Sequence, residues 1–296
     1  MIQEIDNRSY FANFSSHIFY IVIFEYIQKM EIDEIKLESW KCFLDHIKGL
    51  DANNNFIFRG QANKEWGLET TLERFLKKEL IEYHEYEFSL LSIKETIRTL
   101  YPNLSDLKTS DIHELKDFFK SRIPTINNKE TDSRLDLGTK GIEFLAYIRH
   151  FGFPSPLLDW TQSPFIAAYF AFREETSSDP AIYIFSESPW SGSTDPKKTN
   201  YRITGLGHHI MVDKRHISQQ CEYTYCIGWD PSENLFFANH NYCKATDFNS
   251  FYRVTLPQGE RESVLRFLEQ VNINAYTLFH SEDSLMEQLA IKYLRK

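Results

Sequence analysis

Three short segments place polar and charged side chains at the ends of apolar runs, where they could bind a ligand. The first is FIFRGQ at residues 56–61, which ends on Arg59, Gly60 and Gln61. An arginine offers a permanently charged fork that binds a phosphate through two parallel hydrogen bonds. A glycine beside it lets a ligand approach the backbone. This segment therefore indicates an anion-binding position, with an internal ion pair between Arg59 and Asp159 as the alternative.

The second segment, residues 149–172, contains His150, the run Asp159-Trp160-Thr161 and Ser163. His150 could act as a base, and the alternative is a histidine satisfied within the core. The run at 159–161 could equally form a turn with a buried indole. A serine directly before a proline predicts the N-cap of a helix, because the serine oxygen accepts a backbone N–H and proline suits the first helical position.

The third segment, residues 215–226, contains Gln219, Gln220 and Glu222. We expect a strand over residues 220–227. Side chains two positions apart share one face of a strand. Gln220 and Glu222 are therefore predicted to lie together, either in a site or as polar side chains of a sheet that faces water.

Cysteine and glycine patterns argue against a metal centre or a phosphate loop. The four cysteines form no CxxC pair, and none stands at zinc-finger spacing from a histidine. The stretch at residues 205–209 (GLGHH) contains two adjacent histidines and is not expected to bind a metal. No P-loop, GxGxxG, GxSxG or HExxH motif occurs. No metal is therefore expected.

The net charge is −9, from 33 basic and 42 acidic residues, and no clustered basic stripe occurs. Nucleic acid stays open as a partner, but the charge does not support it. The apolar run at residues 17–24 is too short to cross a bilayer, so no membrane association is expected. Few cysteines and no signal peptide indicate a cytoplasmic protein.

Helical and strand periodicities are mixed without a regular βαβ order, which indicates an α+β domain. We expect an N-terminal extension at residues 1–34, a domain at 35–296, and a helical insertion at about 75–138 with low order near 125–138. Helices are predicted over residues 37–47, 70–98, 140–150, 163–173, 260–271 and 285–294. Strands are predicted over residues 56–60, 181–185, 220–227, 251–256 and 276–278.

The motifs together resemble the FRG domain family over about residues 35–294. FRGQ at 58–61 is followed by a W-x-L element at 66–68 and by Arg74, which we expect to brace the strand. The second segment follows the family's H-x-G-x-P and LLDWT pattern, and the third follows R-x-I-x-Q-Q. Trp66 and Trp160 are expected to pack in the core. The chain departs from the family pattern at three positions, namely Arg149 for Gln, Pro156 for Arg and Cys221 for Gly. Loss of the arginine removes one anion contact.

The order of the motifs also resembles the ADP-ribosyltransferase superfamily. That resemblance implies a split, strongly curved mixed sheet flanked by helices, with NAD as substrate. It implies that NAD is bound by Arg59, Gly60, Gln61, His150, Asp159, Trp160, Thr161 and Ser163. It also implies that Glu222 stabilises the oxocarbenium-like state of nicotinamide–ribose cleavage, assisted by Gln220 and Gln219.

The predicted function is that of an NAD-dependent ADP-ribosyltransferase or NAD glycohydrolase, acting as a toxin or phage-defence effector. Its acceptor would be protein, nucleic acid or water. One alternative is a non-catalytic module that senses a nucleotide or nucleic acid through the arginine pocket. A nuclease is the third interpretation, and it would need clustered acidic residues to hold Mg²⁺.

Overall fold

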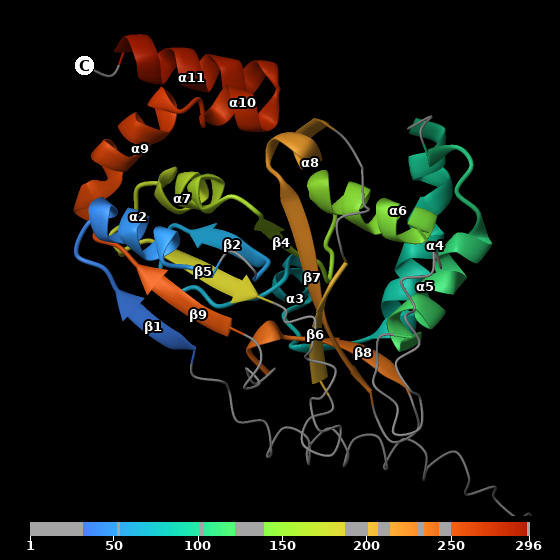
Figure 1. The fold of residues 1–296 in the computed structure, drawn as a ribbon. Coiled ribbons are helices and arrows are strands. Elements are labelled where there is room, and N and C mark those ends of the chain that lie inside the picture. The colour runs from blue at the N-terminus through green and yellow to red at the C-terminus, as the bar shows by residue number, and fades with distance from the viewer. Residues whose placement is uncertain are drawn as a thin grey trace, which may run out of the picture. The chain divides into compact units, whose positions relative to one another are not determined.

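The computed structural model describes residues 32–51, 54–100, 104–121, 139–186, 201–206, 214–229, 234–242 and 250–294 (Figure 1). All of them belong to one compact unit that begins at Ile32. The predicted extension up to residue 31, including the apolar run at 17–24, lies outside the described residues. So do residues 122–138 of the predicted insertion and the histidine pair at 208–209. No helix in the described part combines the length and apolarity needed to span a bilayer.

The described strands form one mixed sheet that curls strongly (Figure 1). Eight strands follow the order β1-β9-β5-β2-β4-β7-β8-β3, and β6 pairs with β7. The β1–β9 pair is parallel and the other pairs are antiparallel. The strands are β1 (Asp33–Lys36), β2 (Phe56–Gln61), β3 (Leu80–Glu82), β4 (Leu158–Thr161), β5 (Ala181–Ser186), β6 (Tyr201–Gly205), β7 (Cys221–Trp229), β8 (Leu235–Ala238) and β9 (Ser250–Thr255). The predicted α+β class and curvature are confirmed, whereas the predicted split is wrong because the hydrogen-bonded path is continuous.

Helices pack on the sheet around two apolar clusters. One cluster joins α2, α7, α9 and α10 to β2, β5 and β9, and the other joins α4, α5 and α6 to β7 and β8. The helices are α2 (Trp40–Lys48), α3 (Thr71–Leu76), α4 (Tyr83–Leu100), α5 (Thr109–Ser121), α6 (Thr139–His150), α7 (Pro164–Phe172), α8 (Lys214–Ser218), α9 (Arg261–Gln270), α10 (Ala275–Phe279) and α11 (Glu282–Leu294). Within the range of the predicted helical insertion, residues 75–138, the structure places helices α4 and α5 and also strand β3, which pairs with β8 in the sheet.

Capping residues set several helix boundaries. Ser163 accepts the backbone N–H of Ile166 and precedes Pro164 at the start of α7, as the sequence predicts. The single helix predicted over 70–98 is wrong, because Lys77 adopts a left-handed conformation that ends α3. The strand predicted at 276–278 is also wrong. Asn274 caps a short helix there by accepting the N–H of Thr277.

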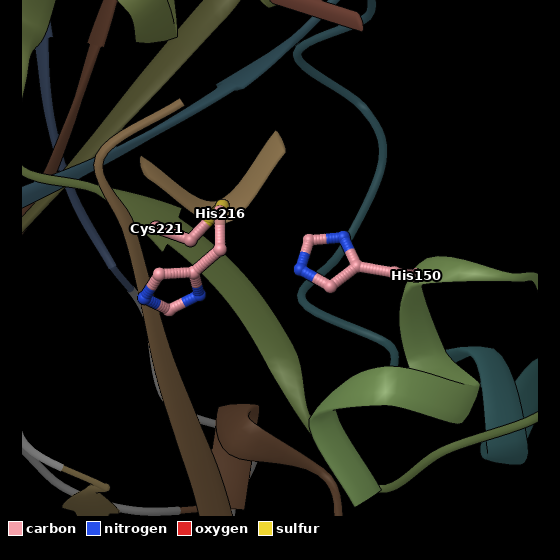
Figure 2. Close-up of side chains that lie close together, drawn as sticks. All are labelled: His150, His216 and Cys221. Carbon is pink, nitrogen blue, oxygen red and sulfur yellow. The ribbon is translucent and has the colours of Figure 1, made fainter. Parts of the chain in front are cut away.

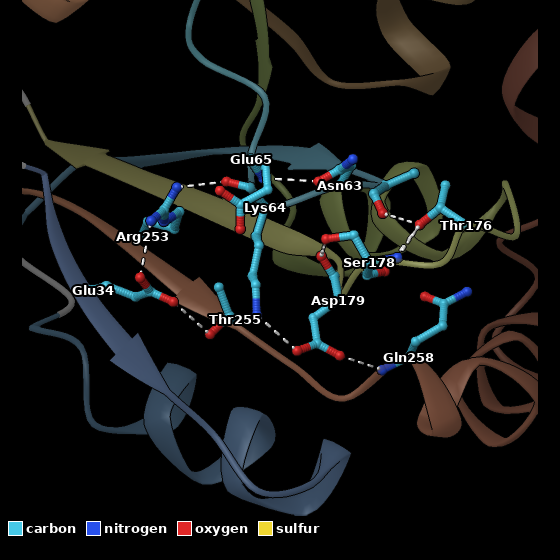
Figure 3. A network of polar contacts seen from close by, with 11 residues as sticks. Glu34, Asn63, Lys64, Glu65, Thr176, Ser178, Asp179, Arg253, Thr255 and Gln258 are labelled. Atoms are coloured by element: carbon cyan, nitrogen blue, oxygen red, sulfur yellow. Dashed lines mark hydrogen bonds and ion pairs between the residues drawn. The ribbon is translucent and has the colours of Figure 1, made fainter.

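A polar network fixes the loop that leaves β2 (Figure 3). Asp179 accepts hydrogen bonds from the Lys64 ammonium at 3.0 Å and from the Gln258 backbone N–H at 3.1 Å. Arg253 donates to the carbonyl oxygen of Lys64 at 2.6 Å and to the carboxylate of Glu34 on β1 at 2.9 Å. These contacts connect the β1–β9 edge of the sheet to the segment that follows Gln61.

Candidate functional site

A cavity of about 740 Å³ brings all three polar segments together. Its lining includes four arginines, Arg59, Arg74, Arg149 and Arg215. Four carboxylates, those of Glu65, Glu69, Asp159 and Glu174, also contribute to the wall, as do the aromatic rings of Trp66, Phe170 and Phe279. Several of the residues predicted to bind a ligand line it as well, namely Arg59, Gly60, Gln61, His150, Asp159, Trp160, Thr161 and Gln219.

Arg59 has no carboxylate partner among the described residues. Its Nη1 donates to the backbone carbonyl oxygen of Asp159 at 2.7 Å, and its buried Nε has no hydrogen-bond partner. The Asp159 carboxylate instead accepts from Nη2 of Arg149 at 2.5 Å. The alternative of an internal ion pair between Arg59 and Asp159 is therefore wrong. Asp159 positions Arg59 through its backbone, and no carboxylate in the described part of the chain neutralises the guanidinium directly.

The charge on Arg59 persists at neutral pH despite its surroundings. Burial is the largest cause that lowers the pKa of Arg59 to about 10; the Asp159 carboxylate raises this pKa, and Arg149 and Arg74 lower it. A group with a pKa of about 10 is protonated at pH 7. An anion bound in the cavity would offset the desolvation cost of the Arg59 charge and the repulsion between the arginines.

Gly60 serves the packing of α7 on β2. A Cβ at this position would lie 1.8 Å from the carbonyl oxygen of Ala167 and 2.7 Å from the backbone nitrogen of Ala171. The backbone of α7 therefore occupies the space that a side chain at position 60 would need. Gln61 is 7% exposed, and its Nε2 donates to the carbonyl oxygen of Gly67 at 3.1 Å. Gln61 thus holds the turn that carries Trp66.

Trp66 contradicts the prediction of a core tryptophan, because 48% of its surface is exposed. Its backbone is fixed by Tyr183, whose hydroxyl donates to the Trp66 carbonyl oxygen at 2.9 Å. Trp160 is a core residue as predicted, with 4% exposure and an indole N–H that donates to Thr224 at 2.7 Å. It lies on β4, so the turn considered for residues 159–161 is wrong. Arg74 donates to the Glu69 carbonyl oxygen at 2.6 Å and thereby braces the segment after β2.

Hydrogen bonds within the second and third segments shape the floor of the cavity. The Thr161 hydroxyl donates to the Gln219 carbonyl oxygen at 2.7 Å and accepts the backbone N–H of Ser163 at 3.1 Å. The Gln219 amide donates to the Leu278 carbonyl oxygen at 3.0 Å. Ser163 itself caps α7 and does not line the cavity. Thr161 and Gln219 therefore connect β4 to the turn before β7.

The predicted pairing of Gln220 with Glu222 on one strand face is wrong. Gln220 has a positive φ of 47°, and β7 begins only at Cys221. Gln220 is exposed, whereas Glu222 is 5% exposed and accepts a hydrogen bond from the Gln162 amide at 2.7 Å. Neither side chain lines the cavity. Burial of Glu222 also excludes the alternative of a sheet carboxylate that faces water.

Two histidines and a cysteine meet beside the cavity (Figure 2). His150 Nε2 lies 2.6 Å and His216 Nδ1 lies 3.2 Å from the hydroxyl of Tyr223. The potential ligand atoms of His150, His216 and Cys221 all lie within 4.8 Å of one another. His150 and Cys221 line the cavity. The spacing of these residues in the sequence does not follow a metal-binding motif, so sequence reasoning missed the cluster.

A comparison with known protein families identifies one match. The model of the FRG domain matches residues 54–180 of the chain. This range covers β2 to the residue before β5, and it is shorter than the domain predicted over residues 35–296. No curated protein and no solved structure matches the chain significantly.

Proposed function

We propose that the chain, whose residues 54–180 form an FRG domain, binds NAD. In this proposal the pyrophosphate of NAD lies against Arg59. One observation carries this proposal, namely a guanidinium at a cavity wall that the Asp159 carboxylate does not neutralise, because this carboxylate pairs with Arg149. A half-buried guanidinium that has no carboxylate partner among the described residues carries a desolvation cost, and a phosphate bound through two hydrogen bonds is its best complement. The site would therefore gain stability when the anion binds.

The size and walls of the cavity suit a dinucleotide. Sites for small molecules typically enclose about 300–1,000 Å³, and this cavity holds about 740 Å³. Trp66 and Phe170 offer aromatic surfaces on which a nicotinamide or adenine ring could stack, whereas the guanidinium groups of Arg173 and Arg215 already lie over the Phe279 ring. Arg149, a departure from the family pattern, adds a second guanidinium to the cavity wall, where it pairs with Asp159.

We propose ADP-ribosyl transfer or NAD hydrolysis as the reaction of this site. An acceptor oxygen or nitrogen would bond to the ribose C1′ as the nicotinamide leaves, and the acceptor would lose its proton to solvent or to a cavity carboxylate. The adjacent strands β2, β4 and β7 carry Arg59, Thr161 and Glu222 in the order that the ADP-ribosyltransferase resemblance implies, and this order favours the reaction. A role as a toxin or phage-defence effector rests on the family resemblance alone.

A second candidate function is nucleotide sensing without turnover. The position of Glu222 favours it, since the one carboxylate predicted to stabilise the oxocarbenium ion is held by Gln162 and does not line the cavity. A binding site that lacks a positioned carboxylate retains affinity for NAD but loses transition-state stabilisation. The nuclease interpretation has no support from the described residues, among which no cluster of three carboxylates occurs.

Calorimetric titration with NAD and a nicotinamide-release assay separate these candidates. Arg59→Ala and Arg59→Lys should each weaken NAD binding at least about tenfold, because a charge-assisted hydrogen bond contributes about 1.5–3 kcal/mol. Arg266→Ala, on the exposed face of α9, is the matched control and should bind normally. Unchanged affinity in both Arg59 variants refutes the proposal. Binding without nicotinamide release, with water or any tested acceptor, establishes sensing instead of catalysis.

A further inference from the structure

We propose that His150, His216 and Cys221 bind a zinc ion at the wall of the cavity. The three side chains come from separate elements, the last residue of α6, helix α8 and the first residue of β7 (Figure 2). Their ligand atoms lie within 4.8 Å of one another. The proposal is independent of NAD binding, because it depends only on the chemistry and placement of these three residues.

The geometry requires a modest contraction of the cluster. Zinc–nitrogen bonds of about 2.0–2.1 Å and a zinc–sulfur bond of about 2.3 Å place tetrahedral ligands roughly 3.3–3.6 Å apart. From separations of up to 4.8 Å, side-chain rotations that move each ligand atom by about 1 Å or less would close the site. His150 and His216 already point toward a shared position, since both contact the Tyr223 hydroxyl.

Three features of the fold hold the ligands for such a site. Cys221 is 8% exposed and lies in register with Thr161, so β4 fixes its backbone. The segment before it is anchored by Gln219, whose amide donates to the Leu278 carbonyl oxygen. Tyr223 bridges the two histidines and orients their rings. Zinc sites depend on contacts of this kind to orient their ligands.

The donor set selects the metal. Two imidazoles and one thiolate favour zinc over magnesium or calcium, which prefer oxygen ligands. Binding would convert the Cys221 thiol into a zinc-bound thiolate and release one proton to solvent. Three protein ligands leave a fourth position for water, which is typical of catalytic rather than structural zinc sites. Because His150 and Cys221 line the cavity, that position is accessible from it.

The nearby arginines set a limit on the affinity. Arg215 precedes His216 directly, and Arg149 precedes His150. Two guanidinium groups near a dication oppose its binding, whereas the thiolate favours it. We therefore expect weaker zinc binding than at a closed four-cysteine site.

Zinc and cobalt binding to the tag-free full-length chain test the proposal. After chelator treatment and reloading, the wild type should retain one zinc ion per chain, measured by elemental analysis. Cys221→Ser and His216→Gln should each lower zinc affinity at least tenfold. Substitution of residues that only hydrogen-bond to the ligands already causes a loss of this size at zinc sites. Cys226→Ser, a buried cysteine on the same strand, is the matched control and should bind zinc as the wild type does.

Cobalt substitution identifies the cysteine ligand directly. A cobalt-loaded wild type should show a thiolate-to-cobalt charge-transfer band, which Cys221→Ser should lack and Cys226→Ser should keep. Circular dichroism of the zinc-free variants checks that each one folds. Zinc uptake by folded Cys221→Ser equal to that of the wild type, or absence of the charge-transfer band from the wild type, overturns the proposal. If Cys221→Ser does not fold, His216→Gln decides instead, and a zinc affinity of this variant equal to that of the wild type overturns the proposal.

Discussion

Replacing Glu73 by glutamine should stabilise the fold at pH 8 much more than at pH 5. Glu73 lies in the first turn of α3, is 5% exposed, and accepts the backbone N–H of Thr70 at 2.5 Å. Burial is the largest cause that raises the pKa of Glu73 to about 7 from its ordinary 4.5, although the hydrogen bonds from Thr70 lower it. The folded chain therefore holds the Glu73 proton more tightly than the unfolded chain does.

The sign and size of the effect follow from this shift. A folded-state pKa above the unfolded value contributes stability that is complete below about pH 4.5 and is lost as the pH rises through about 7. At about 1.36 kcal/mol per pKa unit, the full effect is about 3 kcal/mol, of which roughly 2.5 kcal/mol is lost between pH 5 and pH 8. Glutamine keeps the oxygen that accepts the Thr70 N–H and does not titrate.

Urea unfolding at several pH values between 5 and 8 measures the effect. The difference in free energy of unfolding between Glu73→Gln and the wild type should grow by about 2.5 kcal/mol across this range. Glu114→Gln, at an exposed position on α5, is the control and should follow the wild type. Stability curves of Glu73→Gln and the wild type that run parallel across this range would refute the reasoning, because all other titrating groups are shared.

Three further substitutions test a close backbone contact, a left-handed backbone conformation and a buried hydrogen bond through urea unfolding. Gly60→Ala should lower the free energy of unfolding by about 3 kcal/mol or more, because its methyl group would meet the backbone of α7; Gly259→Ala, which meets nothing within 4 Å, should not. Lys77→Gly should raise it by about 0.5–1 kcal/mol, since Lys77 has a φ of 54°. Trp160→Phe should lower it by about 1–2 kcal/mol, because Thr224 loses the indole N–H. Equal stability of the two alanine variants, a less stable Lys77→Gly or an unaffected Trp160→Phe would contradict these expectations.

Local signals in the sequence predicted most of the elements that form the site. The apolar run ending at Arg59 is β2, and Ser163 with Pro164 marks the start of α7. Errors arose where one residue changes the backbone direction. The left-handed conformation of Lys77 divides a periodic helical pattern, and the capping of α10 by Asn274 overrides the strand preference of its aromatic residues.

The contacts of the side chains around the cavity were less predictable from the sequence than the helices and strands that carry them. Arg59 was identified from its place after an apolar run, but its partner could not be, since Asp159 contacts it through a backbone atom. The strand face of Glu222 depends on where β7 begins, and the periodic pattern does not define that boundary. Proximity of His150 to His216 requires the whole fold, because the two residues belong to different helices with no spacing motif between them.

The sheet order has a consequence for how the chain folds. Strand β2 lies between β4 and β5, and β5 begins at Ala181, one residue after the FRG match ends. β1 pairs with β9, which follows it by about two hundred residues. Pairings so distant along the chain slow folding. During synthesis, the edge of β2 that pairs with β5 therefore stays unpaired until β5 has been made. A fragment that stops at residue 180 would leave this edge exposed to self-association.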